Sequence, residues 1–153
     1  MAKQLELRRG TTQANNLFTG ATGEVTMDTD TKQLRVHDGV KTGGYAVDTL
    51  VAFQAPNAGN NYTWYRKYAS GWVEQGGTNV DVNEVSTTVV TLPIEMADTY
   101  YTALAQNNSL STASDTENGV GIQRTSTTTV TLFAHYINPN TINVSWEVKG
   151  MAA

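Results

Sequence analysis

The sequence predicts an all-β protein built mainly from short antiparallel strands. Residues that favour strands, above all Thr, Val, Tyr and Trp, dominate the ordered stretches, and helix signals are nearly absent. Two segments, 127–136 and 142–149, place apolar side chains at every second position. Successive side chains of a strand point to opposite sides of a sheet, so a period of two indicates half-buried strands. The polar half of each strand must then face water or a partner.

Composition narrows the classes of function that the chain can have. Its formal net charge is −4, which argues against a nucleic-acid groove because such a groove needs a basic stripe. Without cysteine it forms no disulfide, no thiolate metal site and no Cys nucleophile. No segment approaches the roughly 20 apolar residues of a membrane helix, and the charged amino terminus lacks a secretion signal. We therefore expect folding in the cytoplasm, no membrane insertion, no nucleic-acid partner, and neither metal nor cofactor.

The first 49 residues predict a small β unit with a single helical candidate. Residues 4–9 are the first expected strand, and residues 11–17 are the helical candidate, capped by Thr11 or Thr12. Residues 24–28 and 33–37 are expected to form a hairpin across the turn at 29–32. A unit of under about 50 residues buries too little surface to be stable alone. We infer that it shares its core with copies of itself, through the apolar faces of Leu5, Leu7, Val25, Met27, Leu34 and Val36.

The remainder of the chain predicts a β-sandwich that follows a linker. Residues 50–59 begin with apolar side chains and continue with residues typical of loops, a pattern expected of a linker between domains. Strands are then expected at 62–68, 71–76, 87–92, 99–105, 120–124, 128–136 and 142–149. Several short strands at this spacing suggest a sandwich. The polar run 106–118 predicts a long exposed loop, and such loops tend to be functional or disordered.

Each catalytic or metal motif in the chain is incomplete. Residues 28–32 resemble the start of a calcium loop, but its sixth and twelfth positions hold Gln33 and Gly39 in place of Gly and Glu. His37 and His135 lie in different segments, without a nucleophile elbow or a zinc-protease motif. The carboxylates that could pair for glycan hydrolysis lie in no distinctive motif; they are Glu74, Glu84, Glu95, Asp98, Asp115 and Glu117. We therefore expect a binding protein and no enzyme.

The aromatic residues divide into two groups by their expected position. Trp64, Trp72 and Trp146 are large enough to fill a sandwich core or a trimer interface. Tyr101, His135 and Tyr136 are expected outside the core because of their strand phase or edge position. Aromatic side chains at a surface can stack on sugar rings or anchor an interface.

Two stretches resemble known families. Leu7-Arg-Arg-Gly-Thr-Thr, residues 18–32 and Val36-His-Asp-Gly resemble the amino-terminal β-prism of phage receptor-binding proteins of the major tropism determinant type, over residues 4–48. Residues 60–153, with Trp64-Tyr-Arg, Gly71-Trp-Val-Glu-Gln-Gly-Gly and the ending Trp146-Glu-Val-Lys-Gly-Met-Ala-Ala, resemble the tip domain of phage tail fibres. That tip is an antiparallel sandwich similar to the H-type lectins. The resemblance implies a small intertwined trimeric β-prism-like domain followed by a β-sandwich tip, located in the virion tail after assembly in the host cytoplasm.

The resemblance also assigns a role to each part. Residues 1–49 would trimerise and attach to upstream phage tail proteins, 50–59 would link, and 60–153 would bind a bacterial surface receptor, either a glycan or an outer-membrane protein. Strand phase and distance from the linker predict a receptor-binding site of Tyr101, Asn107, Asn108, Gln123, Arg124, His135, Tyr136 and Asn138. Two alternatives stay open: a purely structural trimerising collar or cap, and a glycan-degrading enzyme that uses Glu74, Asp115 or Glu117.

Overall fold

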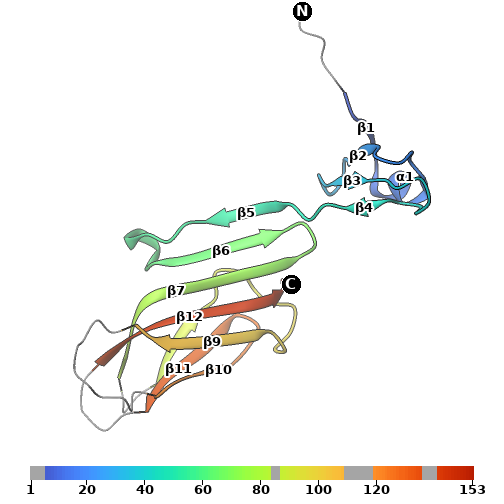
Figure 1. The fold of residues 1–153 in the computed structure, drawn as a ribbon. Helices are drawn as coiled ribbons and strands as arrows, with labels where there is room; N and C mark the ends of the chain where they lie inside the picture. The colour runs from blue at the N-terminus through green and yellow to red at the C-terminus, as the bar shows by residue number, and fades with distance from the viewer. Residues whose placement is uncertain (1–5, 84–86, 109–118, 136–140) are drawn as a thin grey trace, which may run out of the picture. The chain divides into compact units, whose positions relative to one another are not determined.

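The computed structural model describes residues 6–83, 87–108, 119–135 and 141–153 (Figure 1). The regular structure of the described residues consists of strands apart from one short α-helix and one 3-10 helix, which confirms the all-β expectation. The chain divides into two compact units between Leu50 and Val51. Among the described residues, no helix has the length and apolarity that a membrane span requires.

The first unit is a four-stranded sheet with the order β1-β2-β3-β4. Its strands are β1 (Arg8–Gly10), β2 (Val25–Asp28), β3 (Leu34–Val36) and β4 (Tyr45–Ala46). β1 and β2 run parallel, whereas β2–β3 and β3–β4 are antiparallel. The predicted hairpin is therefore present. The first strand begins at Arg8, and residues 4 and 5 of the predicted strand lie outside the described residues. The expected helical turn is α1 (Thr12–Leu17), and the Thr11 hydroxyl caps it by accepting a hydrogen bond from the Ala14 N–H at 3.2 Å.

Polar side chains fill the interior of this first unit. Asp28 and Thr26 are completely buried, and Arg35 and His37 are nearly so. Arg35 Nη2 lies 3.0 Å from Asp28 Oδ2, and the Thr12 hydroxyl donates to Asp28 Oδ1 at 2.9 Å. His37 Nδ1 accepts a hydrogen bond from a backbone N–H at 3.2 Å, and its Nε2 lies 3.0 Å from Thr26 Oγ1. Hydrogen bonds and not apolar packing therefore connect these buried groups, although Nε of Arg35 is buried without a partner.

The apolar side chains of the first unit lie on the opposite face of its sheet. Val25 pairs with Val36 and Met27 pairs with Leu34, so these four share one face. Val25 and Met27 are half-buried, while Leu34 and Val36 are 36% and 40% exposed. Leu7 is also exposed, and Leu5 lies outside the described residues. The face predicted for a trimer core is therefore one that the unit does not cover itself.

The second unit is a sandwich of two sheets (Figure 1). The five-stranded sheet has the order β5-β6-β7-β12-β9, from β5 (Leu50–Gln54), β6 (Thr63–Tyr68), β7 (Trp72–Asn83), β12 (Thr141–Met151) and β9 (Thr102–Asn107). The three-stranded sheet has the order β10-β11-β8, from β10 (Gly119–Arg124), β11 (Thr129–His135) and β8 (Thr87–Thr91). Each strand predicted after residue 60 is present. The segment expected to be a linker carries β5 and a short 3-10 helix, η1 (Ala58–Asn60), because its apolar start joins the sheet.

The core of the second unit lies between the two sheets. Its buried side chains include Val82, Leu92, Met96, Val130, Leu132, Ile142, Val144, Trp146 and Val148. The expectation that Tyr101 lies outside this core is wrong: it is only 4% exposed. Tyr101 immediately precedes β9, and its ring turns inward because its hydroxyl donates to the carbonyls of Ser126 at 2.9 Å and Thr129 at 3.2 Å. Trp72, in contrast, is 40% exposed.

Candidate functional site: a groove on the outer face of the large sheet

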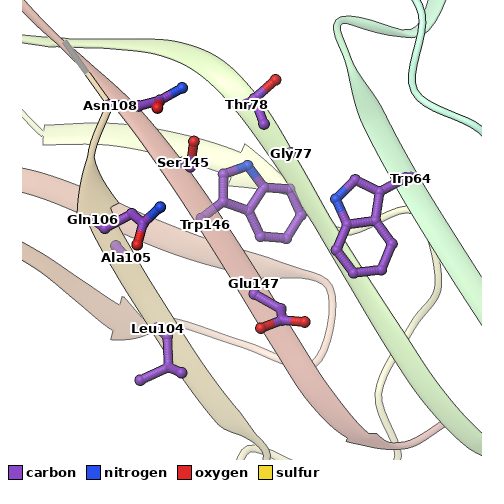
Figure 2. A pocket seen from close by; sticks show the side chains of 10 residues that line it. All are labelled: Trp64, Gly77, Thr78, Leu104, Ala105, Gln106, Asn108, Ser145, Trp146 and Glu147. Carbon is purple, nitrogen blue, oxygen red and sulfur yellow. The ribbon is translucent and has the colours of Figure 1, made fainter. Parts of the chain in front are cut away.

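One row of residues crosses the outer face of the five-stranded sheet. The strand register pairs Trp64 with Gly76, Gly76 with Glu147, and Glu147 with Leu104. Trp146 precedes Glu147 and is buried in the core, so the row that contains Glu147 faces away from the core. A groove of about 520 Å³ lies over this row (Figure 2). Its lining residues are Trp64, Gly77, Thr78, Leu104, Ala105, Gln106, Asn108, Ser145, Trp146 and Glu147.

The indole of Trp64 lies against the backbone of β7. A Cβ at Gly76 would lie 2.8 Å from Cζ2 of Trp64 and 2.6 Å from the carbonyl oxygen of Trp146. Only glycine leaves the room that the ring occupies here. The ring is half-buried, and it lines the groove beside β7 (Figure 2). A flat aromatic surface is thus fixed in place at one side of the groove.

A β-bulge shapes the neighbouring part of the groove. Trp146 pairs with Gly77 and Val144 pairs with Val80, so two residues of β7 stand opposite Ser145 alone. A bulge bends the strand and re-aims its side chains. Thr78 and Ser145 both line the groove at this point, and each brings a hydroxyl group (Figure 2).

The remaining lining combines amides, one exposed apolar side chain and one carboxylate. Gln106 and Asn108 are exposed at the end of β9, and Leu104 is 60% exposed in the same strand. Glu147 Oε1 lies 3.0 Å from Nζ of Lys149, and this hydrogen bond raises the pKa of Lys149 above its ordinary value. The groove therefore offers an aromatic face together with uncharged donors and acceptors. Within the described residues, no His, Asp or Glu cluster could hold a metal ion.

The structure separates the predicted site residues into two groups at opposite ends of the sandwich. Arg124 Nη1 donates to the Tyr101 carbonyl at 3.1 Å, where β10 ends and β9 begins. Gln123 and Arg124 are neighbours in β10, so their side chains leave opposite faces of the sheet. Asn107 and Asn108 lie at the other end of β9, separated from Tyr101 by the length of that strand. These residues do not form one surface.

The end that carries Gln123 and Arg124 is the end at which the unit begins. The Met96 N–H donates to the Thr127 carbonyl at 2.9 Å, and the Ala152 N–H donates to the Gly71 carbonyl at 2.9 Å. Met96 and Ala152 also form a β-bridge, so these contacts connect the β10–β11 turn to the start of β7. Figure 1 shows β5 starting at this same end. The expectation that Gln123 and Arg124 lie far from the linker is therefore wrong, because β10 runs back toward it.

The other predicted residues lie at the far end or beyond the described part of the chain. His135 pairs with Gly119 at the far end of the small sheet, opposite the turn that follows Arg124. Tyr136 and Asn138 lie outside the described residues. Among the predicted residues whose side chains are described, only Asn108 lines the groove.

Two signals in the sequence point to the groove residues that the prediction missed. The polar phase of 142–149 already contained Ser145 and Glu147, which face outward as that alternation requires. The pair Gly76-Gly77 stands opposite Trp64 and Thr63 in the register, where the absence of a side chain makes room for a ring. Gln106 carries no such signal, because it lies beyond the strand that was expected to end at residue 105. Leu104 lies inside that expected strand, but an apolar residue there gives no indication that it faces outward.

Comparison with known proteins shows similarity to phage tail-fibre proteins. Residues 5–41 match the Major tropism determinant N-terminal domain. The tail fiber receptor-binding protein of Bordetella phage BPP-1 is 32% identical over 109 residues, which are 66% of this chain and 29% of that protein. The chain is thus similar to a phage tail-fibre protein over part of its length. This confirms the resemblance found in the sequence, although the chain spans less than a third of the length of that tail-fibre protein.

Solved tail fibres share the fold at lower identity. An N-truncated R2-type pyocin tail fiber superposes with a TM-score of 0.51 at 20% identity, over 67% of this chain and 39% of that one. An R2 pyocin fiber from P. aeruginosa gives a TM-score of 0.50 at 20% identity, over 67% of this chain and 26% of that one. At this identity the likeness establishes the all-β fold of the chain and nothing about its ligand.

Proposed function

We propose that this chain is part of a phage tail fibre in the virion tail and binds a receptor on the bacterial surface through its second unit. The observation that carries the proposal is the groove over Trp64, Gly76 and Glu147, which presents an aromatic ring and polar side chains on a rigid sheet. The relative from Bordetella phage BPP-1 is a tail fiber receptor-binding protein, which supports the same role here.

The first unit is proposed to hold three copies together and to join the fibre to upstream tail proteins. Its interior is polar, and its apolar face, with Leu34 and Val36, is open to solvent in a single copy. Burial of such a face between copies would stabilise the assembly by about 25 cal/mol for each Å² of apolar surface removed from water. Three linked copies would present three grooves, and this raises avidity by up to about 10²–10⁴-fold without any new contact.

The ion pairs of the carboxylates that the structure describes favour binding over catalysis. Among the enzyme candidates, Glu74 faces Arg66 at 3.9 Å, and its side chain is partly buried beside that partner. Asp115 and Glu117 lie outside the described residues. Glu147 lies on the same face as Glu74, but each of these two carboxylates is engaged with a cation, Glu74 with Arg66 and Glu147 with Lys149. Glycan hydrolysis instead needs two carboxyl groups that flank the scissile bond as acid and base or nucleophile.

The test uses the full chain, labelled with a fluorophore, and a broad panel of bacterial strains. We expect light scattering to give a trimer and the labelled protein to adsorb to a subset of the strains. A trimer that adsorbs to no strain would favour the alternative of a structural collar. Release of reducing sugar from lipopolysaccharide or capsule would instead favour the enzyme.

A further inference from the structure

We propose that the groove binds a neutral saccharide, with the indole of Trp64 as the surface on which a sugar ring stacks. This inference rests on the proposed function and assigns the class of receptor that the groove recognises. It depends on three properties of the groove: the fixed aromatic ring, the uncharged hydrogen-bonding groups and the balance of charge around them.

The Trp64 ring is held in the orientation that stacking needs. Contact with the backbone at Gly76 fixes one side of the indole. The ring is therefore ordered before a ligand binds, and binding does not cost the conformational entropy of ordering it. The C–H face of a pyranose ring carries partial positive charge, and the face of an indole is electron-rich. Leu104 stands at the other side of the groove, three strands away in the same row, and adds a second apolar contact.

The polar lining matches hydroxyl groups, which both donate and accept hydrogen bonds. Gln106 and Asn108 each provide an amide oxygen and an amide NH₂, and Ser145 and Thr78 provide hydroxyls. The carboxylate of Glu147 accepts from hydroxyls at the centre of the row.

A peptide strand is disfavoured as the ligand because most of the groove lies over the face of the sheet, from β6 across β7 and β12 to the edge strand β9. The central strands β7 and β12 are paired on both sides, so their backbone groups are already used in the ladder. Strand addition uses backbone groups at an open edge, which only β9 offers at the border of the groove. Recognition over the face itself therefore comes from side chains.

The charges on this face of the sheet cancel, which favours an uncharged ligand. Arg66 pairs with Glu74 at 3.9 Å, and Lys149 pairs with Glu147 at 3.0 Å. A site for phosphate or another anion would present unpaired Arg or Lys side chains.

The row from Trp64 to Leu104 spans three strand spacings, or roughly 14 Å, so there is room for more than one sugar ring.

The experiment measures binding of a defined probe to the full chain. The probe is the neutral polysaccharide released from a strain to which the wild-type protein adsorbs, and heparin is the anionic control. The Trp72→Phe variant keeps Trp64 and the buried Trp146 as fluorophores. We expect a saturable change in its tryptophan fluorescence with the polysaccharide and none with heparin.

Matched variants identify the groove as the site. Trp64→Ala is expected to weaken polysaccharide binding at least tenfold, and Trp72→Ala, which changes an exposed residue of the same type outside the groove, to leave it unchanged. Leu104→Asp and Gln106→Ala alter exposed side chains that do not support the core, so they test the groove if Trp64→Ala fails to fold. We expect each of them to weaken binding by about threefold or more.

The failures of this inference and of the proposed function can be told apart. Undiminished adsorption to cells by folded, trimeric Trp64→Ala and Leu104→Asp variants would overturn the saccharide site and leave the receptor-binding function standing. Adsorption that is lost after protease treatment of the cells, and kept after removal of their polysaccharide, would assign a protein receptor and overturn the inference as well. Absence of adsorption by the wild-type chain would instead contradict the proposed function.

Discussion

Arg35 and Asp28 form an ion pair inside the first unit, with Nη2 of Arg35 3.0 Å from Oδ2 of Asp28. The Asp28 side chain is completely buried, and that of Arg35 is 11% exposed. Arg35 also donates from Nη1 to the Gly43 carbonyl at 3.0 Å, which ties β3 to the loop before β4. A pair of this kind is costly to bury but still more costly to break, because the partner left behind keeps its charge without compensation.

Replacing Arg35 by methionine should therefore destabilise the first unit strongly. Arg35→Met leaves the Asp28 carboxylate buried without its cation, and loss of one partner of a buried pair costs about 3–5 kcal/mol. Urea unfolding of the full chain measures this as a shift of the transition of the first unit. Arg9→Met is the matched control, since Arg9 is exposed and faces Glu6 at 3.7 Å. Equal effects of the two substitutions would mean that the buried pair does not hold the unit together.

Acid should weaken the first unit through Asp28. Burial alone would raise the pKa of Asp28, but hydrogen bonds from the Thr31 N–H, the Thr12 hydroxyl and Arg35 outweigh it and lower the pKa from 3.8 to about 2. A carboxyl whose pKa falls on folding stabilises the folded state above pH 3.8, and this contribution is lost as the pH falls toward 2. Stability measured from pH 6 to pH 2 should decline more steeply for the wild type than for Asp28→Asn. Parallel curves would contradict this role.

Charges placed on the apolar face of the first unit should dissociate the proposed trimer. Leu34→Asp combined with Val36→Asp puts two like charges on the surface that three copies would cover, and burying unpaired charges opposes association. Light scattering at micromolar concentration should change from three chains to one. Val40→Asp is the control, because Val40 is 83% exposed in a turn. A double variant that keeps the mass of the wild type would place the contact between copies elsewhere.

Tyr101 should act on stability and not on binding. Tyr101→Phe removes the buried hydroxyl that donates to the Ser126 and Thr129 carbonyls, and a lost hydrogen bond of this kind costs about 0.5–1.5 kcal/mol. Tyr100→Phe is the adjacent control, since Tyr100 is 85% exposed. Thermal unfolding should separate the two variants, while both adsorb to cells as the wild type does. Loss of adsorption in a stable Tyr101→Phe variant would restore Tyr101 to the receptor site.

The sequence predicts the strands of this protein better than it predicts the contacts that their side chains make with distant segments. Alternation at every second position depends only on the local chain, and it identified each strand after residue 60. The inward turn of Tyr101 depends on carbonyls of residues 126 and 129, which are distant in sequence. The polar interior around Asp28 likewise depends on partners that several segments contribute.

The sequence did not predict the groove for a related reason. Trp64 becomes a groove residue only because the register places Gly76 beside it, and no property of residue 64 reveals that pairing. The positions of Gln123 and Arg124 depend on the direction in which β10 returns across the sandwich. Connection order and cross-strand register are not local properties, so strand phase alone could not assemble the site.

A methyl group at Gly76 should damage both the fold and the groove. A Cβ there would lie 2.6 Å from the Trp146 carbonyl oxygen, which belongs to the backbone of β12 and cannot move aside without disturbing the ladder. Overpacking of this kind costs about 1–3 kcal/mol. The same methyl group would push the Trp64 ring, which lies 2.8 Å away, and so reduce binding of the polysaccharide.

Gly121→Ala is the matched control for Gly76→Ala. Its Cβ would lie 2.0 Å from the ring of Phe133, which is even closer, but that ring is the end of an exposed side chain and can rotate away. We therefore expect the smaller loss of stability at position 121, although the static overlap is larger there. Chemical denaturation of the two variants, with the polysaccharide titration beside it, checks both effects. If Gly121→Ala instead lowered stability more than Gly76→Ala, the Phe133 ring would be a more rigid neighbour than the backbone at Gly76. That result would contradict the conclusion that this backbone fixes the position of the Trp64 ring.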